Sequence, residues 1–161
     1  MIFGSRRDFQ VLTRINRELL SNVVEQEILY YKISLETTTT NIYGESTHKD
    51  YSTPVKLNCL IVRGDQVISI DDFGEDLSRE MSFAFLRQDI ERAEFLPEVG
   101  DIIEWHNDFF EVDTVRENEL FLGRDNNYNL TDYGEKFGKS ISIICDSHLT
   151  RREKTGIQPG L

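Results

Sequence analysis

The 161-residue sequence is poor in cysteine, proline and tryptophan, with two, three and one of them. Two cysteines cannot build the dense disulfide framework that stabilises many small secreted domains. Cys59 and Cys145 both lie in apolar, strand-like runs, which indicates small buried side chains in a reducing compartment. A disulfide between neighbouring strands is geometrically possible, but nothing in the sequence requires one.

Long apolar runs and an excess of basic residues are also missing. No run approaches the roughly 18–20 apolar residues that a membrane span needs. The first residues, MIFGSRRDF, become charged at once and have no hydrophobic signal region, so we expect no secretory signal. The 18 basic residues face 29 acidic ones, for a net charge of −11. A general nucleic-acid binder needs clustered lysine and arginine, so that class is excluded. We expect a protein that is made in the cytoplasm.

The first periodic segment covers residues 8–26. Leu12, Ile15, Leu19 and Val23 recur at helical spacing, with arginine and glutamate on the other side. This pattern predicts an amphipathic helix over residues 8–26. Residues 27–35 (EILYYKISL) are rich in aromatic and β-branched residues, which predicts a strand.

A polar, threonine-rich segment follows over residues 36–53 and contains four successive threonines. Polar segments of this length are uncommon in compact domains unless they are functional or disordered. We predict a projecting arm that reaches a neighbouring subunit; a mobile loop is the alternative. The residues assigned to this contact surface are Asn41, Ile42, Tyr43, Gly44 and Glu45.

Short strands separated by turns make up most of the remaining sequence. Strands are predicted at residues 55–62, 67–70, 77–86, 119–122 and 141–145, with a turn at Gly64 and Asp65, a loop over 71–76 and a short helix over 87–95. A second polar excursion covers residues 124–139. The basic, glycine- and proline-containing residues 150–161 indicate a flexible tail, in which Arg151 and Arg152 are further candidates for subunit contact.

The best-defined feature is a hairpin at residues 102–113. Asn107 and Asp108 tolerate the positive φ of a two-residue turn, which would place Trp105 opposite Phe110 and Ile103 opposite Val112. These four residues, Ile103, Trp105, Phe110 and Val112, are predicted as core. The chain is therefore expected to form one mainly β domain over residues 1–161 with α additions. Its core is a small antiparallel β-barrel or sandwich (27–35 and 55–146), with an N-terminal amphipathic helix and long projecting loops.

Patterns that carry catalysis or hold metals are weak in this sequence. Its three histidines, at positions 48, 106 and 148, lack metal-ligand spacing, and Cys145 and His148 point to opposite faces of a strand. The carboxylates at 71–76 lack the register of a calcium loop and indicate a solvated acidic loop. Glu104, His106 and Glu111 would share the polar face of the hairpin. We expect no enzyme, no metal and no cofactor.

Four runs of the sequence resemble neck and head-completion proteins of T-even-like contractile-tailed bacteriophages. They are residues 14–20 (RINRELL), 24–33 (VEQEILYYKI), 41–49 (NIYGESTHK) and 97–112 (PEVGDIIEWHNDFFEV). The last run is similar to a hairpin of phage head-closure and connector barrels. The resemblance covers about residues 12–146, and its most distinctive part is the Tyr-Gly-Glu segment.

This resemblance implies a structural virion protein of the phage neck. It would form a homo-oligomeric ring, with hexamers expected, that joins the portal side of the capsid to the tail. Portal or adaptor proteins and tail-terminator proteins would be its partners, and residues 41–49 a contact between subunits. A ring of such acidic chains would let DNA pass through its lumen without binding. No catalytic residue is implied.

Three alternatives remain open at this point. The first is a tail-terminator, tail-completion or baseplate subunit, which shares ring geometry. The second is a small metal-dependent enzyme that uses the carboxylates of Asp71–Asp76. The third is an acidic protein that mimics DNA.

Overall fold

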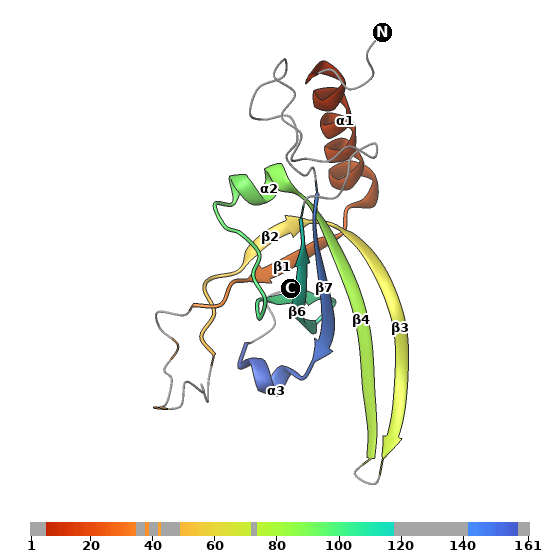
Figure 1. The fold of residues 1–161 in the computed structure, drawn as a ribbon, viewed down its shortest axis with the longest axis vertical. Coiled ribbons are helices and arrows are strands. Elements are labelled where there is room, and N and C mark those ends of the chain that lie inside the picture. The colour runs from red at the N-terminus through yellow and green to blue at the C-terminus, as the bar shows by residue number, and fades with distance from the viewer. Residues whose placement is uncertain are drawn as a thin grey trace.

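The computed structural model describes residues 6–34, 38, 42, 49–71, 74–117 and 142–157. Figure 1 shows an N-terminal helix set beside one curved sheet. The helices are α1 (Arg6–Leu19), continued by the π-helical turn η1 (Leu20–Val24), α2 (Arg87–Arg92) and α3 (Arg152–Thr155). The strands are β1 (Glu27–Tyr31), β2 (Val55–Asn58), β3 (Leu60–Asp71), β4 (Gly74–Leu86), β5 (Ile102–Trp105), β6 (Asp108–Arg116) and β7 (Ser142–Thr150). The predicted mainly β class with an N-terminal helix is confirmed.

The seven strands form a single antiparallel sheet in the order β2-β1-β5-β6-β7-β4-β3. The core was predicted as a barrel or sandwich. The sheet is not closed into a barrel, because no ladder joins the two edge strands, β2 and β3. These edges are nevertheless consecutive in the chain and meet at Cys59, whose backbone N–H donates to the carbonyl of Gln26 at 3.0 Å. The sheet is therefore an open one whose two edges are joined end to end.

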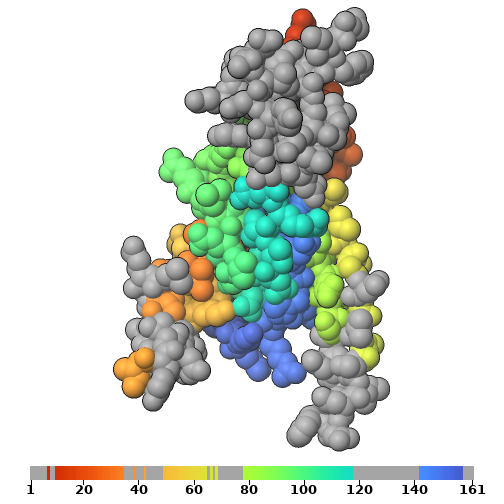
Figure 2. Space-filling model, viewed as in Figure 1, coloured from red at the N-terminus to blue at the C-terminus, as the bar shows by residue number. Residues whose placement is uncertain are grey.

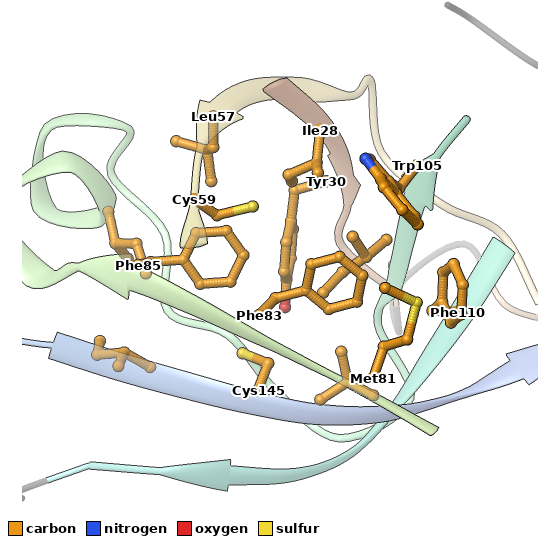
Figure 3. Packing of buried hydrophobic residues seen from close by; sticks show 14 residues of the cluster. Ile28, Tyr30, Leu57, Cys59, Met81, Phe83, Phe85, Trp105, Phe110 and Cys145 are labelled. Atoms are coloured by element: carbon orange, nitrogen blue, oxygen red, sulfur yellow. The ribbon is translucent and has the colours of Figure 1, made fainter. Parts of the chain in front are cut away.

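Strong curvature lets this one sheet enclose a core. Tyr30 on β1 and Phe85 on β4 are four strands apart in the sheet, a distance of about 19 Å if the sheet were flat. Their ring centroids are 6.1 Å apart. Figure 3 shows side chains from β1 and β2 facing those from β4 and β7. The concave face thus holds the larger apolar cluster, which includes Ile103, Trp105, Phe110 and Val112.

The hairpin β5–β6 has a different register from the predicted one. His106 and Asn107 form the turn, with φ of 51° and 67°, so that Trp105 pairs with Asp108 and Ile103 with Phe110. The turn lies one residue earlier than predicted, which moves the pairing by two residues. Because side chains alternate with a period of two, the predicted core residues still share one face.

The long hairpin β3–β4 replaces a predicted turn and most of a predicted loop. Gly64 lies where the register shifts between Arg63 and Gln66, and a Cβ there would approach the carbonyl oxygen of Glu80 to 2.9 Å. Glycine permits this close passage, so the strand continues instead of turning. Beyond Glu80 the hairpin has no further ladder with β7, and Figure 1 shows it extending past the rest of the sheet.

Both cysteines lie in the core as free thiols. Cys59 and Cys145 are fully buried, and burial raises the pKa of each thiol to about 12. At neutral pH the reactive thiolate is therefore almost absent. The predicted role as small buried side chains agrees with this placement.

We expect the native protein to react with a thiol-specific dye only on unfolding, when two thiols per chain should be released. In addition, the unfolded chain loses its thiol protons above the ordinary pKa of about 9, whereas the folded chain keeps them up to about 12. Stability should therefore fall as the pH rises through that interval. Rapid labelling of the native protein at neutral pH would contradict this expectation.

Candidate functional site: the convex face and the projecting elements

The convex face of the sheet carries a second, smaller cluster in which polar groups meet. Leu29, Tyr31, Ile102 and Phe109 form its buried apolar part, with Tyr51 and Ile157 packed against it. These last two residues bring the segment before β2 and the segment after α3 onto the sheet. Residues predicted as a projecting arm and as a flexible tail are therefore ordered here, at 49–53 and at 150–157.

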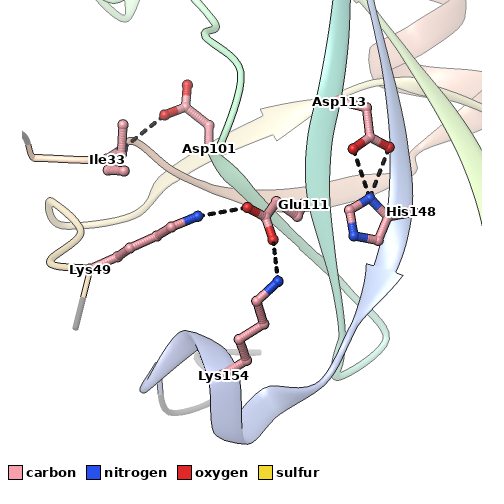
Figure 4. A network of polar contacts seen from close by, with 7 residues as sticks. All are labelled: Ile33, Lys49, Asp101, Glu111, Asp113, His148 and Lys154. Atoms are coloured by element: carbon pink, nitrogen blue, oxygen red, sulfur yellow. Dashed lines mark hydrogen bonds and ion pairs between the residues drawn. The ribbon is translucent and has the colours of Figure 1, made fainter. Parts of the chain in front are cut away.

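Glu111 on β6 connects these two segments (Figure 4). Its carboxylate accepts a hydrogen bond from Lys49 at 2.7 Å and another from Lys154 at 3.3 Å. Burial alone would raise the pKa of Glu111, but the hydrogen bonds and charges of the two lysines outweigh it and lower the pKa. From the sequence, the arm and the tail were expected to be separate contact elements. In the structure the side chain of Glu111 anchors both of them.

A pocket of about 450 Å³ lies between these anchored segments. The pocket is lined by one residue of β1, four residues before β2, three residues of α3 and the two residues after α3. These are Tyr31, Lys49, Asp50, Tyr51, Ser52, Glu153, Lys154, Thr155, Gly156 and Ile157. Burial and the charges of Glu111 and Asp101 raise the pKa of Tyr51 to about 12, so its phenol stays protonated. Both lysines of the lining, Lys49 and Lys154, pair with Glu111, so the pocket lies where the two segments are anchored together; we call this arrangement the joint.

The acid Glu104 is fully buried beneath this joint. Tyr31 donates its phenolic hydrogen to the Glu104 carboxylate at 2.7 Å. Burial first, and then this hydrogen bond, raise the pKa of Tyr31 well above its ordinary value. Sequence reasoning placed Glu104 with His106 and Glu111 on a polar face; the structure buries Glu104, half-buries Glu111 and leaves His106 exposed in the turn.

The histidine considered with Cys145 has a different partner. His148 lies on the convex face, opposite Glu111 in the ladder, and its Nδ1 is 2.8 Å from Asp113. Cys145 belongs to the cluster on the concave face. The two side chains do not meet, as the strand spacing predicted. Among the described residues no group of three or more histidine, cysteine or acidic side chains is placed to hold a metal.

The predicted contact residues are described only in part. Asn41, Tyr43, Gly44 and Glu45 lie outside the described residues, and Ile42 is 94% exposed. Arg151 and Arg152 are exposed at the start of α3, beside the pocket. The side chains of Asp71–Asp76 and the predicted elements at 119–122 and 124–139 also lie outside what is described.

Two exposed apolar features were not assigned to any contact by the sequence. Along α1 and η1, Val11, Ile15, Leu19 and Val23 are between 46% and 72% exposed. On the free edge of the sheet, three β3 side chains are similarly exposed: Leu60, Val62 and Ile68. The helical spacing predicted that the α1 residues form one apolar face. Spacing alone does not show whether the rest of the chain buries that face.

Replacing Glu111 by glutamine should loosen both anchored segments. The two lysines would lose their charged partner, and we expect trypsin to cleave after Lys49 and Lys154 several-fold faster, with a loss of about 1–2 kcal/mol in stability. The carboxylate contributes above its ordinary pKa of 4.5 and loses this effect as the pH falls through its lower folded pKa. The difference in stability between Glu111→Gln and wild type should therefore vanish at acidic pH.

The control for this variant is Glu27→Gln. Glu27 pairs with Lys56 at 2.6 Å, but both side chains are half exposed, so the pair is largely screened. We expect its loss to leave cleavage at Lys49 and Lys154 unchanged. Equal cleavage rates for Glu111→Gln and wild type would show that the joint does not depend on Glu111.

The described helices include none that is long and apolar enough to cross a membrane. The sequence matches no known family model, and no curated protein matches it.

Proposed function

We propose that the protein is a non-enzymatic structural subunit of a tailed-phage virion, whose copies form a ring in the neck between capsid and tail. The observation that carries this proposal is the amount of ordered apolar surface that the chain leaves uncovered. Four residues of α1 and η1 and three of β3 are 46–72% exposed on regular elements. Large exposed patches on ordered elements are typical of protein–protein contact surfaces.

The shape of the chain supports an assembly role as well. Residues 74–79 of β4 pair with β3 and with no other strand of the described part of the chain, and Figure 1 shows this hairpin and α1 extending at opposite ends of the molecule. An isolated two-stranded ribbon is marginally stable in water, so a neighbour that covers it would stabilise it. A subunit with projections at both ends suits an assembly in which each copy touches two others.

The assignment to the neck rests on the resemblance of residues 14–20, 24–33, 41–49 and 97–112 to neck and head-completion proteins. In this setting portal or adaptor proteins and tail-terminator proteins are the partners above and below the ring. The charge fits a conduit: each copy adds −11, so a ring is strongly negative and repels the DNA backbone. DNA would pass the lumen without specific binding.

Immunogold electron microscopy of purified tailed particles that carry the chain tests this proposal. An antibody against the whole chain should label the junction of head and tail, and native mass spectrometry of the protein should give one closed oligomer. Antibody against the major capsid protein serves as the control for access to the particle. Label on the capsid shell or at the distal tail end would contradict the neck assignment.

A further inference from the structure

One side of α1 carries an apolar stripe with a basic border. The stripe consists of Val11, Ile15, Leu19 and Val23, which follow one another at intervals of four residues and are 49%, 46%, 46% and 72% exposed. Residues spaced by four lie on the same side of a helix. Two exposed arginines, Arg7 and Arg14, lie on the same helical side, with the Arg14 side chain 82% exposed. Glu18 is exposed there as well and pairs with Arg14 at 3.3 Å, so the border carries a net positive charge of one.

The opposite side of α1 is fixed to the body of the same chain. Thr13 is 4% exposed, and the Arg17 guanidinium donates to Asp89 at 3.0 Å and to Gln88 at 2.9 Å on α2. On this side Leu12, Leu20 and Val24 are partly buried. The helix is therefore fixed along one side, while the four residues of the stripe face away from the body.

A second surface, formed by the end of α2 and the loop after it from Glu91 to Val99, has a net acidic character. Leu96 and Val99 are 53% and 65% exposed. Glu91, Arg92, Glu94 and Glu98 are exposed as well. Glu98 pairs with Lys32 at 3.4 Å, so Glu91 and Glu94 are the acids without an ion pair among the described residues. The space-filling view shows the end of α2 and the segment after it at the surface, in green, next to the blue-green of β5 and β6 (Figure 2). We call this surface the acidic loop.

Contacts with the rest of the chain fix the backbone of the acidic loop. Phe95 packs on Tyr30 with ring centroids 4.8 Å apart, and Pro97 is buried. The N–H of Glu98 donates to the Asp101 carboxylate at 2.8 Å, and Lys32 donates to the carbonyl of Leu96 at 2.7 Å. With its backbone anchored, the loop presents its apolar side chains with little backbone ordering cost on binding.

We propose that the α1 stripe of one copy docks on the acidic loop of a second copy. Apolar side chains would meet apolar side chains, while Arg7 and Arg14 would lie against the glutamates of the partner copy. Complementary charge at the border of an apolar contact favours this pairing and disfavours α1 against α1, which would bring arginines together. The inference rests on the proposed ring, and it names the two surfaces that build it.

The distribution of charge favours a second copy over an anionic membrane, the other partner that a basic amphipathic helix suits. Residues 6–24 contain four arginines against Asp8 and Glu18, a net charge of +2. Because the whole chain carries −11, the remaining residues carry −13. An anionic bilayer would repel that body, whereas a second copy offers the acidic loop.

Such a contact joins two different surfaces, so every copy keeps one free surface for the next neighbour. Contacts of this kind grow in one direction and close into a ring when the rotation between copies allows it. A contact of one surface with itself would stop at a dimer.

Cysteine cross-linking of the full chain distinguishes these geometries. The double variant Ile15→Cys with Val99→Cys, oxidised under native conditions, should give a ladder of dimers, trimers and larger species on a non-reducing denaturing gel. A mixture of the two single variants should give dimers only, and each single variant alone should stay monomeric. Wild type is the control, since its own cysteines are buried.

A charge exchange provides the second measurement. Arg14→Glu should raise the concentration needed for half-maximal assembly roughly tenfold in sedimentation velocity, and adding Glu94→Arg should restore it. Lys56→Glu, a charge reversal of an exposed β2 residue outside both surfaces, should leave it unchanged. A monomeric double cysteine variant, dimers of Ile15→Cys alone, loss of assembly in Lys56→Glu only, or binding of the chain to anionic phosphatidylserine vesicles instead would each overturn the inference. If gold labels the neck but no series of cross-linked oligomers forms, this contact alone is refuted. If the cross-linked oligomers form but gold does not label the neck, the neck assignment alone is refuted.

Discussion

Replacing Phe110 by alanine is expected to lower the free energy of unfolding by about 3–5 kcal/mol. Phe110 is fully buried on β6 and lies against Phe83 of β4, with ring centroids 5.5 Å apart at an angle of 62°. These two strands are separated by β7 in the sheet, so the ring pair spans the concave face. Its removal leaves a cavity between parts of the sheet that are not hydrogen-bonded to each other.

Urea unfolding followed by the fluorescence of Trp105 measures this loss. Val62→Ala is the control, because that side chain is 55% exposed and its truncation should change stability by less than about 0.5 kcal/mol. Since single domains are typically stable by about 5–15 kcal/mol, the Phe110 variant should lose a large part of the total. An equal, small loss in both variants would mean that the concave face does not form the core.

Replacing Asp101 by alanine is expected to cost about 3–5 kcal/mol for a different reason. The carboxylate is fully buried and accepts three hydrogen bonds: from the Tyr30 hydroxyl at 2.7 Å, from the Ile33 N–H at 2.8 Å and from the Glu98 N–H at 2.8 Å. Without it, one buried and two partly buried donors lose their acceptor. Leaving buried polar groups unpaired costs far more than an average hydrogen bond contributes.

Unfolding in urea and hydrogen exchange of the acidic loop together test this prediction. Besides the global loss, the amides from Glu94 to Gly100 should exchange faster, because the anchor of that loop is gone. Asp108→Ala is the matched control: its carboxylate is 46% exposed and, among the described residues, pairs with Arg79 at 3.1 Å, so about 1 kcal/mol or less is expected. If both variants behave alike, Asp101 is not the anchor that its contacts indicate.

Local patterns predicted those parts of the fold that depend on neighbours in the sequence. The helical period of residues 8–26 corresponds to α1 and η1, and the alternation around Trp105 corresponds to β5 and β6. The exact turn was missed because both His106–Asn107 and Asn107–Asp108 can adopt positive φ. The turn that forms places Asp108 in β6, where its carboxylate contacts Arg79 of β4, a residue far away in the sequence.

The rest of the site depends on residues that are far apart in the sequence. Asp101 and Glu104 are two of 29 acidic residues, and nothing in the neighbouring sequence marks these two for full burial. Tyr30 and Tyr31, which pair with them, lie about seventy positions earlier. Likewise, Gly64 looks like a turn until β4 brings the carbonyl of Glu80 against it. Only the three-dimensional pairing supplies this information.

The joint at Cys59 has a consequence for how the sheet opens. In most sheets the two edge strands fray independently, because separate stretches of chain form them. Here β2 and β3 are one run of backbone with a single residue between them. When β2 detaches from β1, the chain at Cys59 is released and the first pair of the β3–β4 ladder, Leu60 with Ala84, loses its fixed end. The two margins of the sheet should therefore share one opening event, and their amide hydrogens should exchange at a common rate.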